Sequence, residues 1–405
     1  MSLLSKFVDH RKVFVIGLLL IAVGLPISPL LISVGQIILV INWVIEGNFK
    51  NKIESLKALD TGLLVYLGIF AIHIFGLTYT ENWSYAFHDL KIKLPLLILP
   101  LVIGTSAWIK RKEFELVLVA FISAVGFSTL ASLLAFLGFL DVPINDIRNI
   151  SIFISHIRFS LMICLSFFFT LYFIKRYHYH FNDYLAYILG IIALWFLVFL
   201  GLLGARIGFV GLMASLVVLA SYYTYRSSRK LVAIPIFSLI LIFPIVGYFF
   251  VPNVQYRVNE LITEYEDIKQ GESANGNSIQ QRLMYWEYAS EIIKMNPILG
   301  VGTGDISDAF VSYYSENETG LKHKYKLRAH NQYLSVLATF GILGLLIFLI
   351  AIFHPIYKAH YRMDIWFTMF LIIMMLSFIT EDTLETQSGV TLFTLFYSIL
   401  YKRVP

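Results

Sequence analysis

The stretch that decides the fold is residues 231–250, LVAIPIFSLILIFPIVGYFF, which contains no charged side chain. A helix needs roughly 20 residues to cross about 30 Å of hydrocarbon, and this block has that length. Similar blocks recur along the 405-residue chain, in which 58% of residues are apolar and 14% are charged. Soluble chains average about 45–50% apolar and about 25% charged residues. The composition therefore excludes a disordered protein and an ordinary soluble enzyme, and it predicts an all-α polytopic membrane protein.

Apolar blocks divide the chain into about twelve predicted transmembrane helices. Their expected limits are 13–27, 30–45, 60–79, 93–108, 115–139, 157–174, 185–203, 206–224, 231–250, 331–356, 364–380 and 389–401. The tight turn between Pro26 and Pro29 predicts a hairpin of short, tilted helices at the start. We therefore expect nine transmembrane helices in residues 1–250, a large loop with amphipathic helices in 251–330, and three transmembrane helices in 331–405.

The Lys and Arg residues are spread unevenly over the two sides that these spans define. With a cytoplasmic N-terminus, 18 of the 31 fall on the cytoplasmic side, 5 on the opposite side and 8 in the long loop. Short cytoplasmic loops are rich in Lys and Arg, whereas long loops cross the membrane largely regardless of charge. We therefore expect both termini in the cytoplasm and the loop on the outer face, which in a bacterium is the periplasm. The net charge of +5 is too small and too scattered to indicate nucleic-acid binding.

The loop at 251–330 has the pattern of two amphipathic helices. Apolar residues recur at helical spacing over 254–268, and Gly271 is a plausible end of that helix. Ser278, with Gln281 three residues later, predicts a capping box that opens a second helix. Such helices on a membrane face usually lie flat on it or cap the bundle.

Arg206 is the clearest candidate for a functional charge. It lies on the predicted outer side, in Leu202-Leu203-Gly204-Ala205-Arg206-Ile207-Gly208, and the short connection keeps it near the apolar blocks. An arginine at such a place is costly and needs a partner. It is either a helix-end arginine that snorkels to the interface or an anion ligand that faces the bundle interior. Gly204 and Gly208 would leave room for a ligand, which favours the second interpretation.

Arg282 lies on the second predicted loop helix. It is about 40° from Trp286 at about 100° per residue, so it borders the apolar stripe of that helix. A guanidinium group suits bidentate contacts with phosphate at the level of the lipid headgroups. The alternative is a surface arginine that pairs with a carboxylate of the loop.

His330 begins the tenth predicted span, in His330-Asn331-Gln332-Tyr333-Leu334. Histidine can act as a general base near pH 7, so at the membrane surface it could take a proton from an acceptor hydroxyl. Asn331 or Tyr333 could orient the histidine or the substrate. A purely structural histidine at a helix start is the alternative.

Other polar groups lie at the predicted outer ends of spans. Glu381, Asp382 and Glu385 lie between the last two spans, where they form either a solvated loop or a carboxylate partner for an arginine. His156 and Arg158 at the start of the sixth span are weaker candidates of the same kind. The candidate substrate-binding residues are therefore His156, Arg158, Trp286, Asn331, Tyr333 and Glu381.

Two negative observations narrow the chemistry. The glycine run at 300–304 lacks the flanking strand and helix of a dinucleotide site and the lysine of a phosphate-binding loop, so we interpret it as a turn that returns the loop to the membrane. Motifs typical of zinc or other metal sites are also missing from the sequence. We therefore expect a reaction that uses no metal and no other cofactor.

Taken together, these segments resemble the bacterial O-antigen ligase and O-antigen polymerase superfamily, in order, from about residue 60 to the end of the chain. The stretches that carry the resemblance are His156–Leu161, Gly204–Gly208, Gln281–Trp286, Asn296–Gly304, His330–Leu334 running into Phe340–Leu345, and Glu381–Gly389. Members of the superfamily often have Ser or Thr where this chain has Ala205. That departure weakens a role for a hydroxyl at this place but not the role of the arginine.

The resemblance implies a membrane-embedded glycosyltransferase with a fold like that of the C-type glycosyltransferases. Such proteins move a glycan from undecaprenyl diphosphate to an acceptor hydroxyl at the outer face of the inner membrane. Their essential arginines match Arg206 and Arg282, and their histidine after the loop matches His330. The implied mechanism has the arginines bind the diphosphate and His330 activate the acceptor, with inversion at the anomeric carbon.

Several activities fit this resemblance. We favour an O-antigen ligase that acts in lipopolysaccharide biosynthesis on lipid A–core, because the loop is compact and no large C-terminal soluble domain is visible. A polysaccharide polymerase and a protein O-oligosaccharyltransferase are the alternatives within the superfamily. A transporter of a lipid-linked anion is an alternative from another class, since intramembrane arginines also serve transport.

Overall fold

The computed structural model describes residues 9–58, 61–142, 150–177, 183–227, 230–357 and 364–403. Secondary structure in these residues is helical throughout. The helices are α1 (His10–Ile27), α2 (Pro29–Glu46), α3 (Phe49–Ala58), α4 (Thr61–Phe75), α5 (Trp83–Lys93), α6 (Pro95–Thr105), α7 (Arg111–Phe136), α8 (His156–Tyr177), α9 (Asp183–Leu203), α10 (Arg206–Tyr225), α11 (Ala233–Phe250), α12 (Pro252–Gln270), α13 (Ser278–Met295), α14 (Ile306–Glu316), α15 (Gln332–Tyr357), α17 (Ile365–Thr380) and α18 (Gln387–Arg403). The predicted all-α polytopic class is confirmed.

Among the described residues, nine helices are long and apolar enough to cross a membrane, and Ile365–Thr380 is a shorter apolar helix. This number is smaller than the twelve spans expected from the sequence. The predicted span at 93–108 contains only the 11 residues of α6, because α5 ends at Lys93 and Pro95 begins a new helix. An 11-residue helix is about 16 Å long, so α6 is shorter than the hydrocarbon layer.

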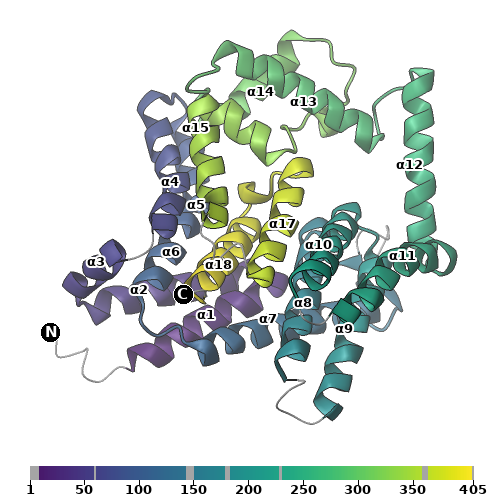
Figure 1. Ribbon diagram of the computed structural model, residues 1–405. Coiled ribbons are helices and arrows are strands. Elements are labelled where there is room, and N and C mark those ends of the chain that lie inside the picture. The colour runs from purple at the N-terminus through teal and green to yellow at the C-terminus, as the bar shows by residue number, and fades with distance from the viewer. Residues whose placement is uncertain are drawn as a thin grey trace.

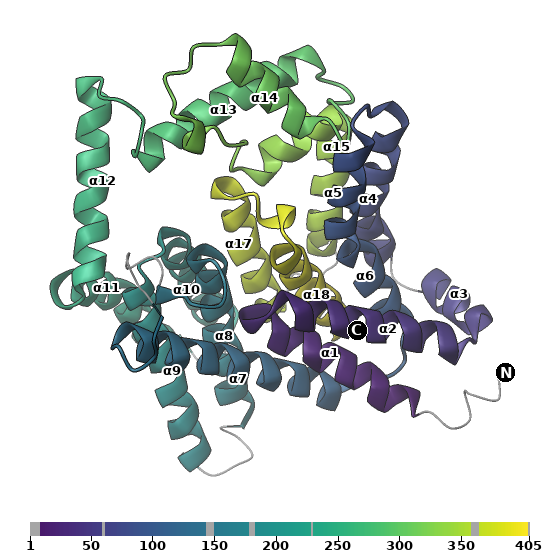
Figure 2. The same cartoon turned by 180° about the vertical axis from the view of Figure 1, so that it is seen from behind.

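The first two helices form the predicted hairpin, with Ser28 between them. Their axes approach closely because glycines meet at the contact: a Cβ on Gly35 would lie 2.7 Å from the carbonyl oxygen of Gly17. Helix α1 also packs against α7. Both views show this layer crossing the lower part of the molecule (Figures 1 and 2).

The centre of the molecule is formed by α8 and α18, and α11 lies at its edge. Of the most apolar part of α8, 78% is buried, against 11% for α11. In α18, Val390, Phe393 and Phe396 are fully buried. The exposed apolar side chains of α11 are those expected of a helix that faces lipid.

The long loop forms a second layer beyond one end of the bundle. Helix α12 stands apart at the edge of the molecule, whereas α13 and α14 lie above α15 and α17 (Figures 1 and 2). As predicted, α12 ends at Gly271, which has a φ of 72°. The predicted capping box is wrong, because Asn277 caps α13 by accepting a hydrogen bond from the Gln280 N–H, and Ser278 contacts Glu264 instead. The sequence pattern did not reveal α14.

Candidate functional site

The glycine run after α13 joins the loop to the transmembrane bundle, as its interpretation as a turn predicts. Gly341 has a φ of 63° and kinks α15, which leaves carbonyl groups of the preceding turn without helical partners. Val301 N–H donates to the Ala338 carbonyl at 3.0 Å, and Gly302 N–H donates to the Thr339 carbonyl at 2.9 Å. On the far side of the kink, Ile342 N–H donates to the Pro297 carbonyl. The turn therefore fixes the loop helices relative to α15.

Arg206 begins α10 and points toward the loop helices. Its Nη1 donates to Glu264 Oε2 at 3.0 Å and to Ser278 Oγ at 3.1 Å, and its Nη2 donates to Glu260 Oε2 at 2.9 Å. A Cβ on Gly204 would lie 2.6 Å from Asn253 Nδ2, and one on Gly208 would lie 2.6 Å from Ser160 Cβ. Both glycines thus make room for neighbouring protein atoms. Gly204 also lines the cavity described next, whereas Gly208 does not, so the expectation that the glycines leave space for a ligand is corrected for Gly208.

Arg206 and Arg282 line one cavity of about 570 Å³, which we call the arginine cavity. Arg206 comes from α10 and Arg282 from α13, so the cavity lies between the bundle and the loop layer. Its wall contains the apolar side chains of Ile207, Val210, Leu261, Ile279, Leu283, Leu376 and Ile379. A cavity that combines guanidinium groups with an apolar wall suits an amphipathic ligand with an anionic head.

Glu381 connects the second arginine to the histidine. Its Oε1 accepts a hydrogen bond from Arg282 Nη2 at 3.0 Å, and its Oε2 lies 3.4 Å from His330 Nδ1. Burial acts to raise the pKa of Glu381, but the hydrogen bond from His330 and the charge of Arg282 outweigh it and lower the pKa. Glu381 is therefore an ionised link between the two groups.

His330 and Arg158 line a second cavity, of about 330 Å³, which we call the histidine cavity. Glu381 lines both cavities and thus lies between them. His330 has a φ of 45°, which is uncommon for a residue other than glycine. The Asp382 carboxylate holds this conformation, because it accepts the backbone N–H groups of His330 and Asn331, both at 3.1 Å.

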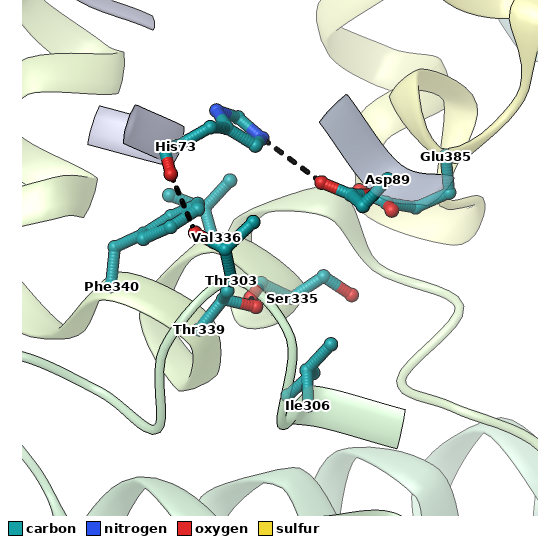
Figure 3. Close-up of a pocket in the computed structure, with 9 residues that line it drawn as sticks. All are labelled: His73, Asp89, Thr303, Ile306, Ser335, Val336, Thr339, Phe340 and Glu385. Carbon is teal, nitrogen blue, oxygen red and sulfur yellow. Dashed lines mark hydrogen bonds and ion pairs between the residues drawn. The ribbon is translucent and has the colours of Figure 1, made fainter. Parts of the chain in front are cut away.

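A cluster of buried charges supports this arrangement and was not found from the sequence. Lys93 is 1% exposed, and its Nζ lies 2.8 Å from Glu385 Oε2 and 3.4 Å from Asp89 Oδ1. Asp89 Oδ2 lies 3.9 Å from His73 Nε2, and the Thr303 hydroxyl donates to the His73 carbonyl (Figure 3). The cavity drawn there has a volume of about 20 Å³, so it has room for little more than a water molecule. We therefore assign the cluster a supporting role, because a substrate does not fit there.

The remaining predicted residues fall into two groups. His156 and Trp286 line the arginine cavity. Asn331 and Tyr333 line neither cavity: the Asn331 side chain caps α15 by accepting the backbone N–H groups of Tyr333 and Leu334, and the Tyr333 hydroxyl donates to the Met375 carbonyl. The structure thus gives these two a part in holding α15.

Part of the chain matches a known protein family. Residues 191–349 match the O-antigen ligase family. The match begins in α9, ends in α15 and includes Arg206, Arg282 and His330. A search of curated proteins finds no match. Residues 191–349 of this multi-pass membrane protein are therefore an O-antigen ligase domain, of the O-antigen ligase and polymerase superfamily.

Proposed function

We propose that the protein is a glycosyltransferase of the O-antigen ligase type, which moves a glycan from undecaprenyl diphosphate to a hydroxyl of lipid A–core. The observation that carries this proposal is the convergence of Arg206 and Arg282 on one cavity, with His330 linked to that cavity through Glu381. The family match agrees with the reaction class. The donor, the acceptor and the roles of the residues are part of the proposal.

The arginine cavity is proposed to bind the lipid diphosphate. In the structure, Glu260 and Glu264 pair with Arg206, and Glu381 pairs with Arg282. The diphosphate would bind beside these carboxylates or in their place. The two guanidinium groups would then stabilise its negative charge as it leaves. Trp286 also lines this cavity, and its buried indole N–H has no hydrogen-bond partner among the described residues. The apolar wall would hold the start of the lipid chain.

His330 is proposed to act as the general base. The acceptor oxygen attacks the anomeric carbon as its proton passes to the imidazole, and the bond between that carbon and the diphosphate oxygen breaks with the electron pair going to the diphosphate. Attack on the face opposite the leaving group inverts the configuration. Two guanidinium groups supply the positive charge that a divalent cation supplies in other diphosphate-leaving reactions, so we propose that the reaction is independent of metal. Glu381 would orient the imidazole through Nδ1 and stabilise the imidazolium.

The site is proposed to face the periplasm from the bacterial inner membrane, with both termini in the cytoplasm. Support comes from the excess of Lys and Arg in the short segments assigned to the cytoplasmic side. A donor made on the inner face and turned across the membrane would then meet its acceptor at the loop layer.

The proposal is tested by transfer from undecaprenyl-diphosphate-linked glycan to lipid A–core by purified protein in EDTA. We expect Arg206→Gln, Arg282→Gln and His330→Ala each to lower kcat/KM by at least about 100-fold, because each removes an interaction of the transition state. Lys294→Met is the matched control: Lys294 lies on α13 with Arg282, its side chain is 70% exposed, and it lines neither cavity. Its rate should equal that of the unmodified protein.

The products separate the related activities. A ladder of longer lipid-linked glycans in place of glycosylated lipid A–core would show a polymerase. Full activity of the His330→Ala protein would remove the base assignment, and loss of transfer in EDTA that Mg²⁺ restores would remove the metal-independent mechanism. Uptake of the donor into vesicles without any transfer would favour a transporter.

A further inference from the structure

Two cations of the histidine cavity, Arg158 and Lys326, form no ion pair with a carboxylate among the described residues, although the charge of the nearby Glu381 acts on Arg158. Among the described residues, no carboxylate oxygen lies within 4.0 Å of the Arg158 guanidinium or of Lys326 Nζ. Lys326 Nζ donates to the Tyr314 carbonyl at 3.3 Å and lies 5.7 Å from the centre of the Tyr314 ring. Both side chains line the cavity that contains His330. They are therefore available to an anion from outside the chain.

The carboxylates of the same cavity are already engaged by the protein. Glu381 pairs with Arg282 and His330, and Glu385 pairs with Lys93 and Arg328. Asp382 accepts two backbone N–H groups and the Ser335 hydroxyl. Arg158 and Lys326 are thus the charged side chains of the cavity that are left without an ion pair or a carboxylate contact. An isolated cation at the edge of a membrane span is costly, so Arg158, in the first turn of α8, is expected to have a function.

The histidine cavity also has the shape of a separate binding site. Its volume of about 330 Å³ is at the lower end of the range of small-ligand sites, roughly 300–1,000 Å³, so it fits a short piece of glycan. The aromatic rings of Phe310 and Tyr314 are part of its wall, as in many sites that hold sugar rings against a flat apolar surface. Glu381 separates it from the arginine cavity, so both cavities can be filled together.

We propose that the histidine cavity is the acceptor site, and that Arg158 and Lys326 recognise a phosphate or carboxylate group that the acceptor glycan carries near its reactive hydroxyl. The identification of the bound sugar as the acceptor rests on the proposed function. The binding of an anionic sugar in this cavity does not depend on it. Recognition through charge would place the hydroxyl next to His330, which lines the same cavity.

Binding is measured first, without any reaction. Saturation-transfer NMR on the full-length protein in nanodiscs uses mannose 6-phosphate, glucuronate and, as neutral control, mannose. We expect a charged sugar to bind and mannose to bind more weakly, and Arg158→Gln and Lys326→Met each to raise the dissociation constant of the charged sugar about tenfold. Arg158→Lys should recover part of the affinity, which a variant that merely misfolds would not do. The preference between the two charged sugars identifies the anion.

Two controls place the binding in this cavity. Lys294→Met on α13 and Lys322→Met, which change exposed lysines that line neither cavity, should both leave the affinity unchanged. Equal binding of mannose and the charged sugars, no binding of any of them, or unchanged affinity in both cavity variants would overturn the inference.

A transfer assay then tests whether the histidine cavity binds the acceptor. With lipid A–core as acceptor, the two cavity variants should raise the KM for acceptor about tenfold and leave the KM for donor unchanged. Acceptor stripped of phosphate, or with reduced carboxyl groups, should lose the same factor with the unmodified protein. If charged sugars bind as expected but the unmodified protein transfers nothing, the proposed function fails and the anion site stands. If the variants change only the KM for donor, the acceptor assignment fails.

Discussion

Glu385 is the carboxylate that pairs with two of the buried or partly buried cations, Lys93 and Arg328. Its carboxylate lies 2.8 Å from Lys93 Nζ and 3.7 Å from Arg328 Nη2, and it also accepts a hydrogen bond from Gln332. Burial acts to raise its pKa, but the two cations outweigh burial and lower the pKa to about 2. This carboxylate therefore ties α5 and the start of α15 to the segment between α17 and α18.

The lowered pKa predicts how stability depends on pH. Above the usual value of 4.5, Glu385 is ionised in both the folded and the unfolded chain, and the full stabilisation is present. As the pH falls from 4.5 toward 2, only the unfolded chain takes up the proton, so stability is lost. Lys93→Met should lower the free energy of unfolding by about 3–5 kcal/mol at pH 7, because it leaves a buried carboxylate without its nearest cation. It should also flatten the acid dependence of the melting temperature. An unchanged acid profile in that variant would contradict the assignment.

A site residue could be predicted from the sequence where a charged or titratable side chain lies within or beside an apolar stretch. Arg206, Arg282 and His330 stand out because a charge or an imidazole interrupts or borders an apolar stretch. Lys93, Asp89 and Arg328 do not stand out, because each resembles an ordinary loop charge in its own segment. They acquire their role only when α5 is brought against the segment after α17.

At the scale of elements, the kink of α15 and the glycine turn form one joint, which gives a second prediction. A Cβ on Gly341 would lie 2.1 Å from the Ile298 carbonyl oxygen, and its φ of 63° disfavours any other residue. Gly341→Ala should lower stability by at least roughly 2 kcal/mol and abolish transfer, because the loop layer would lose its place on α15. Gly190→Ala is the control, since a Cβ on Gly190 meets nothing within 4 Å in α9 and should raise stability by up to about 1 kcal/mol. Thermal unfolding of both proteins checks this, and equal melting would contradict it.

Helices with a strong periodic pattern were predictable, and those that depend on remote contacts were not. The ends of α12 and α13 follow from Gly271 and Asn296, whose local chemistry stops a helix. The sequence predicts that Ser278 caps α13. In the structure the Ser278 hydroxyl donates a hydrogen bond to Glu264 of α12, and Asn277 caps the helix instead. A local sequence pattern cannot show that Glu264, on another helix, competes with the α13 backbone for Ser278.

At the scale of the whole molecule, the orientation in the membrane is the prediction most in need of a test, because α6 is too short to count as a plain span. Cys164 is buried and is the chain's single cysteine, so a Cys164→Ala protein is a clean background. Lys294→Cys on α13 should react with a membrane-impermeant maleimide in intact spheroplasts. Lys112→Cys at the start of α7 should react only after the membrane is permeabilised. The reverse pattern would invert the topology.

The two cavities could not be predicted at this scale. Each is lined by residues more than 150 positions apart, such as Arg206 with Glu381 and Arg158 with His330. The ordered set of motifs indicated the family, and residues 191–349 bear this out. That His330 and the two arginines lie on opposite sides of one carboxylate follows from packing of α13, α15 and the segment after α17.

Two cavities that share a wall also imply a particular order of events in turnover. Because donor and acceptor can bind at the same time, the glycan can pass directly between them without a covalent glycosyl-enzyme intermediate. Initial rates at several fixed concentrations of acceptor should then give double-reciprocal lines that intersect, as for a ternary complex. Parallel lines would show a ping-pong scheme in which the first product leaves before the second reactant arrives. The position of Glu381 between the two cavities is thus the structural reason to expect a ternary complex.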